Sequence, residues 1–178
     1  MTTNVSSNVR ILGSVSVMDG SGIVRIEDRF DTDIDDLWTA ITDPRRLAQW
    51  LCEVEGDLRT GGDVRIHYFG SGWEGTCRIE ACEPPHRFQI RGKDEGLSYE
   101  TVKEVVLTSM GDQTLLVVEE RGMPADKVAA YGAGNQIEVE DLASYLAGDK
   151  AEDAEERWKA LQPAYEELAG ATDRNAAD

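Results

Sequence analysis

One long segment in the second half of the chain, residues 124–148, has the clearest helical pattern of apolar and polar positions. Its apolar residues recur at intervals of three, four and seven, which is the spacing of one face of a helix. That face comprises Val128, Gly132, Asn135, Val139, Leu142, Ala143 and Leu146. Almost every segment before it alternates as a strand does. The pattern therefore predicts one helix covered by one sheet.

Other residues of the same segment predict its solvent-facing side and its start. Polar residues outside the apolar face are expected to point to water: Glu138, Glu140, Asp141 and Ser144. Gly132 and Gly134 are poor helix formers. The helix is therefore expected to bend at these glycines or to start late, so that its regular part begins near Asn135.

The N-terminal part predicts a hairpin followed by two short helices. Alternating apolar residues at 9–17 and 24–30 flank an Asp-Gly turn, a pattern typical of hairpins. Apolar residues at helical spacing then predict helices at 34–41 and 45–51, and the side-chain oxygens of residues 31–33, Asp-Thr-Asp, are available to cap the first of them.

The middle of the chain predicts an antiparallel meander, because short turns rich in Gly and Pro separate alternating runs. Strands are expected near 53–59, 62–70, 73–82, 86–93, 99–109 and 113–121. A last helix is expected at 151–169, with a kink or restart at Pro163. The predicted fold class is α+β, with an antiparallel sheet of about six or seven strands curled around the long C-terminal helix. No linker divides residues 1–178, so one domain is expected.

The charge balance narrows the classes of partner. The 178 residues carry 18 basic and 35 acidic side chains, a formal net charge of −17. Nucleic acid is not expected as a partner, because binding phosphates needs clustered Lys and Arg. The start of the chain lacks the features of a signal peptide, and no apolar run is long enough to span a membrane. Together with three sparsely placed cysteines, this predicts a soluble, cytoplasmic protein with no membrane partner.

Several longer strings carry a resemblance to a known family. They are VRIEDRFDTDIDDLWTAITDPRRLAQWL, GDLRTGGDVRI, CEPPHRF, VVEERGMPA and YGAGNQIEVEDLASYLAG. Together they resemble the START-like (SRPBCC) helix-grip superfamily, in the bacterial branch named after the activators of the heat-shock protein 90 ATPase. The likeness covers a core at 22–148, with an added hairpin strand at 9–21 and a helical tail at 149–178.

The resemblance implies a cavity between sheet and closing helix, often holding an apolar small molecule. It implies no reaction, because the superfamily includes lipid carriers, hormone receptors, polyketide cyclases and co-chaperone domains. One position departs from the family pattern, since Asn135 stands where members usually have Trp. An Asn there should leave room and one polar group inside the grip. If the Asn135 side chain is buried without a hydrogen-bond partner, the protein loses about 1–3 kcal/mol of stability.

Two motifs suggest cofactor or metal chemistry, and both are better explained without it. Residues 70–75 match the dinucleotide motif G-x-G-x-x-G, but strand-like residues on both sides predict a hairpin turn. A zinc site would have to gather His67, Cys77, Cys82 and His86. The two cysteines are five residues apart, so on a regular strand they face opposite sides. No cofactor and no metal are expected.

Catalytic residues are not evident in the sequence. No Ser, Cys or His lies in a recognisable nucleophile or acid–base motif. Glu119 and Glu120 are adjacent in a strand, so one of them can face the cavity. That carboxylate is expected to be bonded to an arginine or to the backbone. A cavity carboxylate with a raised pKa would favour an enzyme.

The leading hypothesis is a protein that binds a small apolar or amphipathic molecule between sheet and helix. Its expected binding residues are Tyr68, Trp73, Cys77, Phe88, Tyr131, Asn135 and Val139. Core packing is the alternative role for each aromatic side chain, whereas Trp158 and Tyr165 are expected to fasten the tail. The other hypotheses are a module that stimulates a chaperone ATPase, which is not favoured, and a cyclase-like or hydrolase-like enzyme. A homodimer is possible.

Overall fold

An eight-stranded antiparallel sheet is the main layer of the computed structural model, which describes residues 9–93 and 96–175. Its strand order is β1-β2-β8-β7-β6-β5-β4-β3. The strands are β1 (Gly13–Met18), β2 (Ser21–Phe30), β3 (Cys52–Gly56), β4 (Asp63–Tyr68), β5 (Glu74–Glu83), β6 (Arg87–Lys93), β7 (Glu100–Met110) and β8 (Gln113–Pro124).

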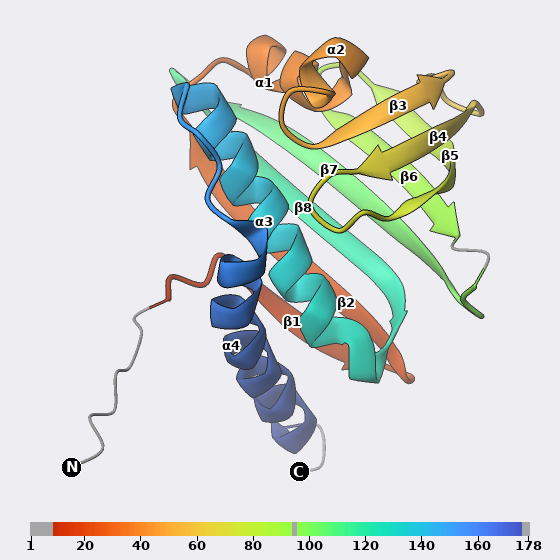
Figure 1. Ribbon diagram of the computed structural model, residues 1–178, viewed down its shortest axis with the longest axis vertical. Helices are drawn as coiled ribbons and strands as arrows, with labels where there is room; N and C mark the ends of the chain where they lie inside the picture. Colours follow the sequence, from red (N-terminus) through yellow and green to blue (C-terminus); the bar gives the residue numbers. More distant parts are fainter. Residues whose placement is uncertain (1–8, 94–95, 176–178) are drawn as a thin grey trace.

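The helices lie against one face and one end of this sheet (Figure 1). They are α1 (Ile34–Thr42), α2 (Pro44–Leu47), a 3₁₀ turn at Ala125–Lys127, α3 (Val128–Ala147) and α4 (Ala154–Asn175). Helix α3 crosses β2 and β8, and α4 packs on β1 and on α3. This arrangement is the helix-grip fold that the sequence predicts.

The sheet has more strands than the six or seven predicted, because the N-terminal hairpin joins it. Strand β1 pairs with β2, and β2 pairs with β8, in registers that run through Val15↔Val24 and Val24↔Glu120. Helices α1 and α2 then carry the chain from β2 to β3 at the opposite edge. The hairpin is therefore an integral part of the sheet.

The two short helices form where the sequence places their caps. The Asp33 carboxylate accepts a hydrogen bond from the backbone N–H of Asp36 at 2.9 Å. Asp43 caps α2 in the same way, through the N–H of Arg45 at 2.8 Å. Side-chain oxygens at these positions satisfy amides that have no partner within the helix. The predicted cap from residues 31–33 is confirmed, and Asp33 is the residue that provides it.

Helix α3 begins earlier than predicted. It is regular from Val128 and runs through Gly132 and Gly134 without a break. A Cβ atom on Gly132 would lie 2.5 Å from Cδ1 of Tyr165, so this glycine provides close packing against α4. The prediction of a start near Asn135 is wrong, because glycine can serve packing as well as end a helix.

The predicted solvent-facing side of α3 is wrong for three of its residues, because Glu140 and Asp141 are held by α4 and Glu138 pairs with Lys103 of β7. Arg157 of α4 binds Glu140 and Asp141 of α3 and donates to the carbonyl of Ile137 at 2.8 Å. Gln136 is fully buried beneath this contact. Helix α3 is therefore packed on two sides, by the sheet and by α4.

Helix α4 is one continuous helix past Pro163, so the predicted restart does not occur. Tyr165 is fully buried, and its hydroxyl donates to Oε1 of Gln136 at 2.7 Å. The predicted role of Tyr165 in fastening the tail is confirmed. No helix among the described residues is long and apolar enough to cross a membrane.

Candidate functional site: two cavities under helix α3

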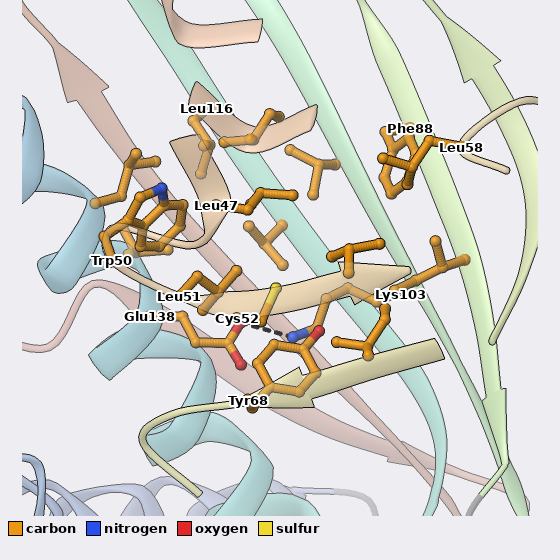
Figure 2. A pocket seen from close by; sticks show the side chains of 18 of the residues that line it. Leu47, Trp50, Leu51, Cys52, Leu58, Tyr68, Phe88, Lys103, Leu116 and Glu138 are labelled. Atoms are coloured by element: carbon orange, nitrogen blue, oxygen red, sulfur yellow. Dashed lines mark hydrogen bonds and ion pairs between the residues drawn. The ribbon is translucent and has the colours of Figure 1, made fainter. Parts of the chain in front are cut away.

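Two neighbouring cavities lie between α3 and the sheet. The smaller encloses about 90 Å³ and is almost wholly apolar, with aliphatic side chains, Trp50 and Phe88 around it (Figure 2). The larger encloses about 300 Å³ and combines aromatic, polar and charged walls. Both volumes far exceed that of one water molecule. The larger one has the size at which ligand pockets begin.

The walls of the larger cavity come from the sheet, α3, α4 and the segment before β7. Its described lining residues are Tyr68, Ser71, Trp73, Cys77, Ile90, Gly92, Leu97, Tyr99, Thr101, Lys103, Glu120, Ala130, Tyr131, Gly134, Asn135, Glu138 and Trp158. Inward strand positions supply many of them, because alternate residues of a strand point to the same face.

A partly buried ion pair lies where the two cavities meet, with the Lys103 side chain 15% exposed and that of Glu138 29% exposed. Nζ of Lys103 on β7 donates to Oε2 of Glu138 on α3 at 2.7 Å (Figure 2). The same ammonium lies 3.7 Å from Oε2 of Glu120 and 5.6 Å from the ring centroid of Tyr68. Lys103, Glu138 and Tyr68 line both cavities. This ion pair therefore forms part of the wall of each cavity.

The environment of the pair shifts the pKa values of its members. Burial alone would lower the pKa of Lys103. The electrostatic interactions with Glu138, Tyr68 and Glu120 outweigh burial, so the pKa of Lys103 lies well above its usual value. Burial raises the pKa of Glu138, and the nearby Lys103 opposes that shift. Lys103 is accordingly charged at neutral pH.

The cavity thiols are protonated at neutral pH. Burial raises the pKa of Cys52 to about 12 and that of Cys77 to about 11. Since the thiolate is the reactive form, these side chains act as small apolar groups of the wall.

Asn135 is bonded on one side only. Its Nδ2 donates to Oε2 of Glu120 at 2.7 Å and to the carbonyl of Tyr131 at 2.9 Å. Its Oδ1 is buried and has no hydrogen-bond partner within the described parts of the chain. The expectation that a buried Asn needs a partner is met for the amide nitrogen by Glu120. Within residues 9–93 and 96–175, no group satisfies the oxygen.

The family model for "Activator of Hsp90 ATPase homolog 1-like protein" matches residues 31–147, which is most of the chain and includes α3 and every strand after β2. The chain belongs to this family. A search of curated proteins finds no match.

Solved structures show the same fold. CalU16 from Micromonospora echinospora is 27% identical, with a TM-score of 0.73 over 88% of this chain and 95% of its own. DynU16, a protein in the dynemicin biosynthetic locus, is 30% identical, with a TM-score of 0.65 over 74% of this chain. That match spans about half of DynU16 (49%). MLL2253 from Mesorhizobium loti is 24% identical, with a TM-score of 0.62 over 72% of this chain and 98% of its own, and shows the fold alone.

In this family member, the sequence-predicted binding residues all lie on cavity walls. Those on the larger cavity are Tyr68, Trp73, Cys77, Tyr131 and Asn135, and those on the smaller are Tyr68, Phe88 and Val139. The structure thus divides one predicted site into two adjoining cavities. That these side chains bind a ligand stays a prediction.

The prediction that one carboxylate of the pair Glu119 and Glu120 faces the cavity is confirmed for Glu120, but its partners are the Asn135 amide and Lys103 and not the expected arginine or backbone. Sequence reasoning missed Lys103, Glu138 and the contribution of α4. Lys103 points to the same face of β7 as Val105 and Leu107, so strand alternation could have revealed it. Trp158 lines the larger cavity as well as packing near Gly134. No sequence signal assigns it to the cavity, because it lies beyond the family core.

The suggestions of cofactor and metal chemistry gain no support. Residues 70–75 lie in and around the turn between β4 and β5, as predicted, and the elements before and after them in the chain are strands. In the part of the chain that the structure describes, no three His, Cys, Asp or Glu side chains gather as a metal site.

Proposed function

We propose that this protein binds a small apolar or amphipathic molecule in the larger cavity under α3. The observation that carries the proposal is the cavity of about 300 Å³, walled by Tyr68, Trp73, Tyr99, Tyr131 and Trp158. Cavities of this size with aromatic walls and a few polar groups are typical ligand sites. Burial of the ligand's apolar surface supplies the affinity.

The unpaired oxygen of Asn135 is the polar group that orients the ligand. An unmade hydrogen bond at a buried oxygen costs free energy, so a ligand N–H or O–H that reaches it gains affinity. Because this oxygen is shielded from solvent, contact requires a small rotation of the Asn135 side chain or of its neighbours.

The structural relatives agree with a small organic ligand. DynU16 belongs to the dynemicin biosynthetic locus, and its fold matches this chain over 74% of the residues. A protein of such a locus is expected to meet small organic molecules. The likeness supports the class of ligand and leaves its identity open.

Fluorescence titration with N-phenyl-1-naphthylamine, an apolar dye that emits strongly in dry sites, tests the proposal. The informative variant is Thr101→Phe, which places a ring in the larger cavity. Its matched control is Thr108→Phe, the same substitution at an exposed position of β7 that points to the opposite face of the sheet. We expect saturable binding to the native protein and to T108F, and at least tenfold weaker binding to T101F.

Two outcomes would contradict the proposal. The first is the lack of saturable binding of the dye to the native protein. The second is equal affinity of native protein and T101F, which would place the dye elsewhere.

An enzyme of cyclase or hydrolase type is the second candidate, because Glu138 is a cavity carboxylate whose pKa is raised by burial. Such groups can act as general acids or bases. Lys103 already binds this carboxylate at 2.7 Å, so Glu138 is not a free base. Binding therefore ranks first. A Glu138→Gln variant that binds ligand normally but loses a measured turnover would reverse that order.

A further inference from the structure

The larger cavity contains more negative than positive charge. Among its described lining residues, the charged side chains are Lys103, Glu120 and Glu138. Lys103 is closest to Glu138, with 2.7 Å between Nζ and Oε2, and lies 3.7 Å from Glu120 (Figure 2 shows the closer pair). One ammonium therefore faces two carboxylates, and the set has a formal charge of −1.

Glu120 is the less well compensated of the two carboxylates, because the ammonium lies 3.7 Å from its Oε2 and only 2.7 Å from that of Glu138. The Glu120 side chain is 8% exposed, and its short hydrogen bond comes from the neutral amide of Asn135. An amide donor satisfies a lone pair but does not neutralise a charge. Since a buried carboxylate is costly without a counter-charge, a cation brought by a ligand would be favoured here.

Aromatic rings surround the same space. Tyr68, Trp73, Tyr99, Tyr131 and Trp158 line the cavity. The faces of such rings attract cations, and aromatic cages recognise quaternary ammonium groups in this way. Lys103 already lies over the Tyr68 ring, so one cation–π contact exists in this cavity. The walls thus suit an apolar cation better than an apolar anion.

The charge of the whole chain acts in the same direction. A formal net charge of −17 raises the local concentration of cations and lowers that of anions. We propose that the larger cavity selects an apolar molecule that carries one positively charged amine, either protonated or quaternary. This inference rests on the proposed binding function and narrows its ligand class.

Two molecules of nearly the same shape test the charge preference. Benzyltrimethylammonium and neopentylbenzene differ in one atom, a quaternary nitrogen in place of carbon, and both are small enough for a cavity of about 300 Å³. Each is used to displace N-phenyl-1-naphthylamine from the native protein, with phenylacetate as the anionic comparison. We expect the ammonium compound to bind at least tenfold more tightly than its neutral counterpart, and phenylacetate to bind most weakly.

The variant that tests the assignment to Glu120 is Glu120→Gln, which keeps an oxygen for the Asn135 amide. Its control is Glu119→Gln, the neighbouring residue, which faces the other way and pairs with Arg121. Both change the net charge equally. E120Q should lose most of the preference for the cation, and E119Q should retain it.

The outcomes separate this inference from the proposed function. Equal binding of the ammonium compound and neopentylbenzene to the native protein would overturn the charge preference and leave the binding function standing. A preference that E120Q and E119Q reduce equally would show that Glu120 is not its source and would overturn the assignment. If the dye binds and none of the three compounds displaces it, the cation inference also fails. If the dye does not bind at all, the proposed function itself fails.

Discussion

Two adjacent amide side chains on α3, Asn135 and Gln136, are both buried, and they differ in what surrounds them. Gln136 faces α4 and the N-terminal segment, where Oε1 accepts from the N–H of Leu12 and from Tyr165, and Nε2 donates to Arg10 and Glu140. Asn135 faces the larger cavity and has an oxygen without a partner in the described chain. Around Gln136 the contact between α3 and α4 is closed and the amide is fully bonded, whereas the side of α3 against the sheet holds cavities, one of them also walled by Trp158 of α4, and an incomplete polar network.

This difference separates residues that hold the fold from residues that can serve binding. A fully bonded buried group makes the structure unique and rigid. A half-bonded group beside a cavity lowers stability and offers a contact to a ligand. The following substitutions test this division, beginning with the one of largest expected effect.

Replacing Lys103 with Met should destabilise the protein most. It leaves Glu138 and Glu120 in the cavity wall without a counter-charge, and breaking a pair shielded to this extent costs about 3 kcal/mol in unfolding free energy, the lower end of the range for buried pairs. Urea unfolding followed by tryptophan fluorescence measures the loss. The control, Lys159→Met, removes an exposed lysine paired with Glu155 and should change stability by less than about 0.5 kcal/mol.

The same variant should show a defined pH dependence. Burial already raises the pKa of Glu138, and losing Lys103 would raise it further. When the pKa of a carboxyl is higher in the folded protein than in the unfolded protein, the protein loses stability as the pH rises from the unfolded pKa through the folded pKa. The difference in unfolding free energy between the native protein and K103M should therefore become smaller as the pH falls from 7 to about 4. A deficit that is constant or grows on acidification would exclude this explanation.

The amide pair itself gives the second test. Gln136→Leu leaves the Leu12 N–H, the Tyr165 hydroxyl and the Arg10 carbonyl without their partner, and should cost about 3 kcal/mol. Asn135→Leu removes one donor to Glu120 together with an oxygen that had no partner, and should cost about 1 kcal/mol. Equal losses in urea unfolding would remove the distinction between the two sides of α3.

Substitutions at two glycines of α3 should change the stability in opposite directions and by smaller amounts. Gly132→Ala puts a methyl group 2.5 Å from the Tyr165 ring on the closed side, and should cost about 2 kcal/mol. Gly134→Ala puts it 3.6 Å from Trp158 at the cavity, an ordinary contact, and should gain about 0.5–1 kcal/mol from helix propensity. Thermal unfolding of the two variants resolves the difference. Destabilisation of both would mean that the cavity side is packed as tightly as the other.

Much of the fold could be predicted because its signals are local. Alternation over a few residues defines the strands, and Asp33 marks the start of α1. The closed side of α3 could not be predicted in this way. Its contacts join residues far apart in sequence, such as Leu12 with Gln136 and Arg157 with Ile137. Polar residues that another helix covers look the same in sequence as polar residues that face water.

The candidate site was predictable in its apolar part and less so in its charged part. Aromatic residues on inward strand positions point to the cavity, and so does an Asn on the apolar face of α3. The pairing of Lys103 with Glu138 depends on how β7 and α3 align in space. Neither residue has a local pattern that marks it as a partner of the other.

The central claim is that the cavity side of α3 receives a ligand while the other side holds the fold. The most direct measurement follows the side-chain amide NMR signals of Asn135 and Gln136 during titration with indole, an apolar aromatic molecule with one N–H donor. The Asn135 signals should shift in a saturable manner, and those of Gln136 should stay nearly constant. Saturable indole binding that leaves Asn135 unchanged, or that shifts both amides equally, would contradict the claim.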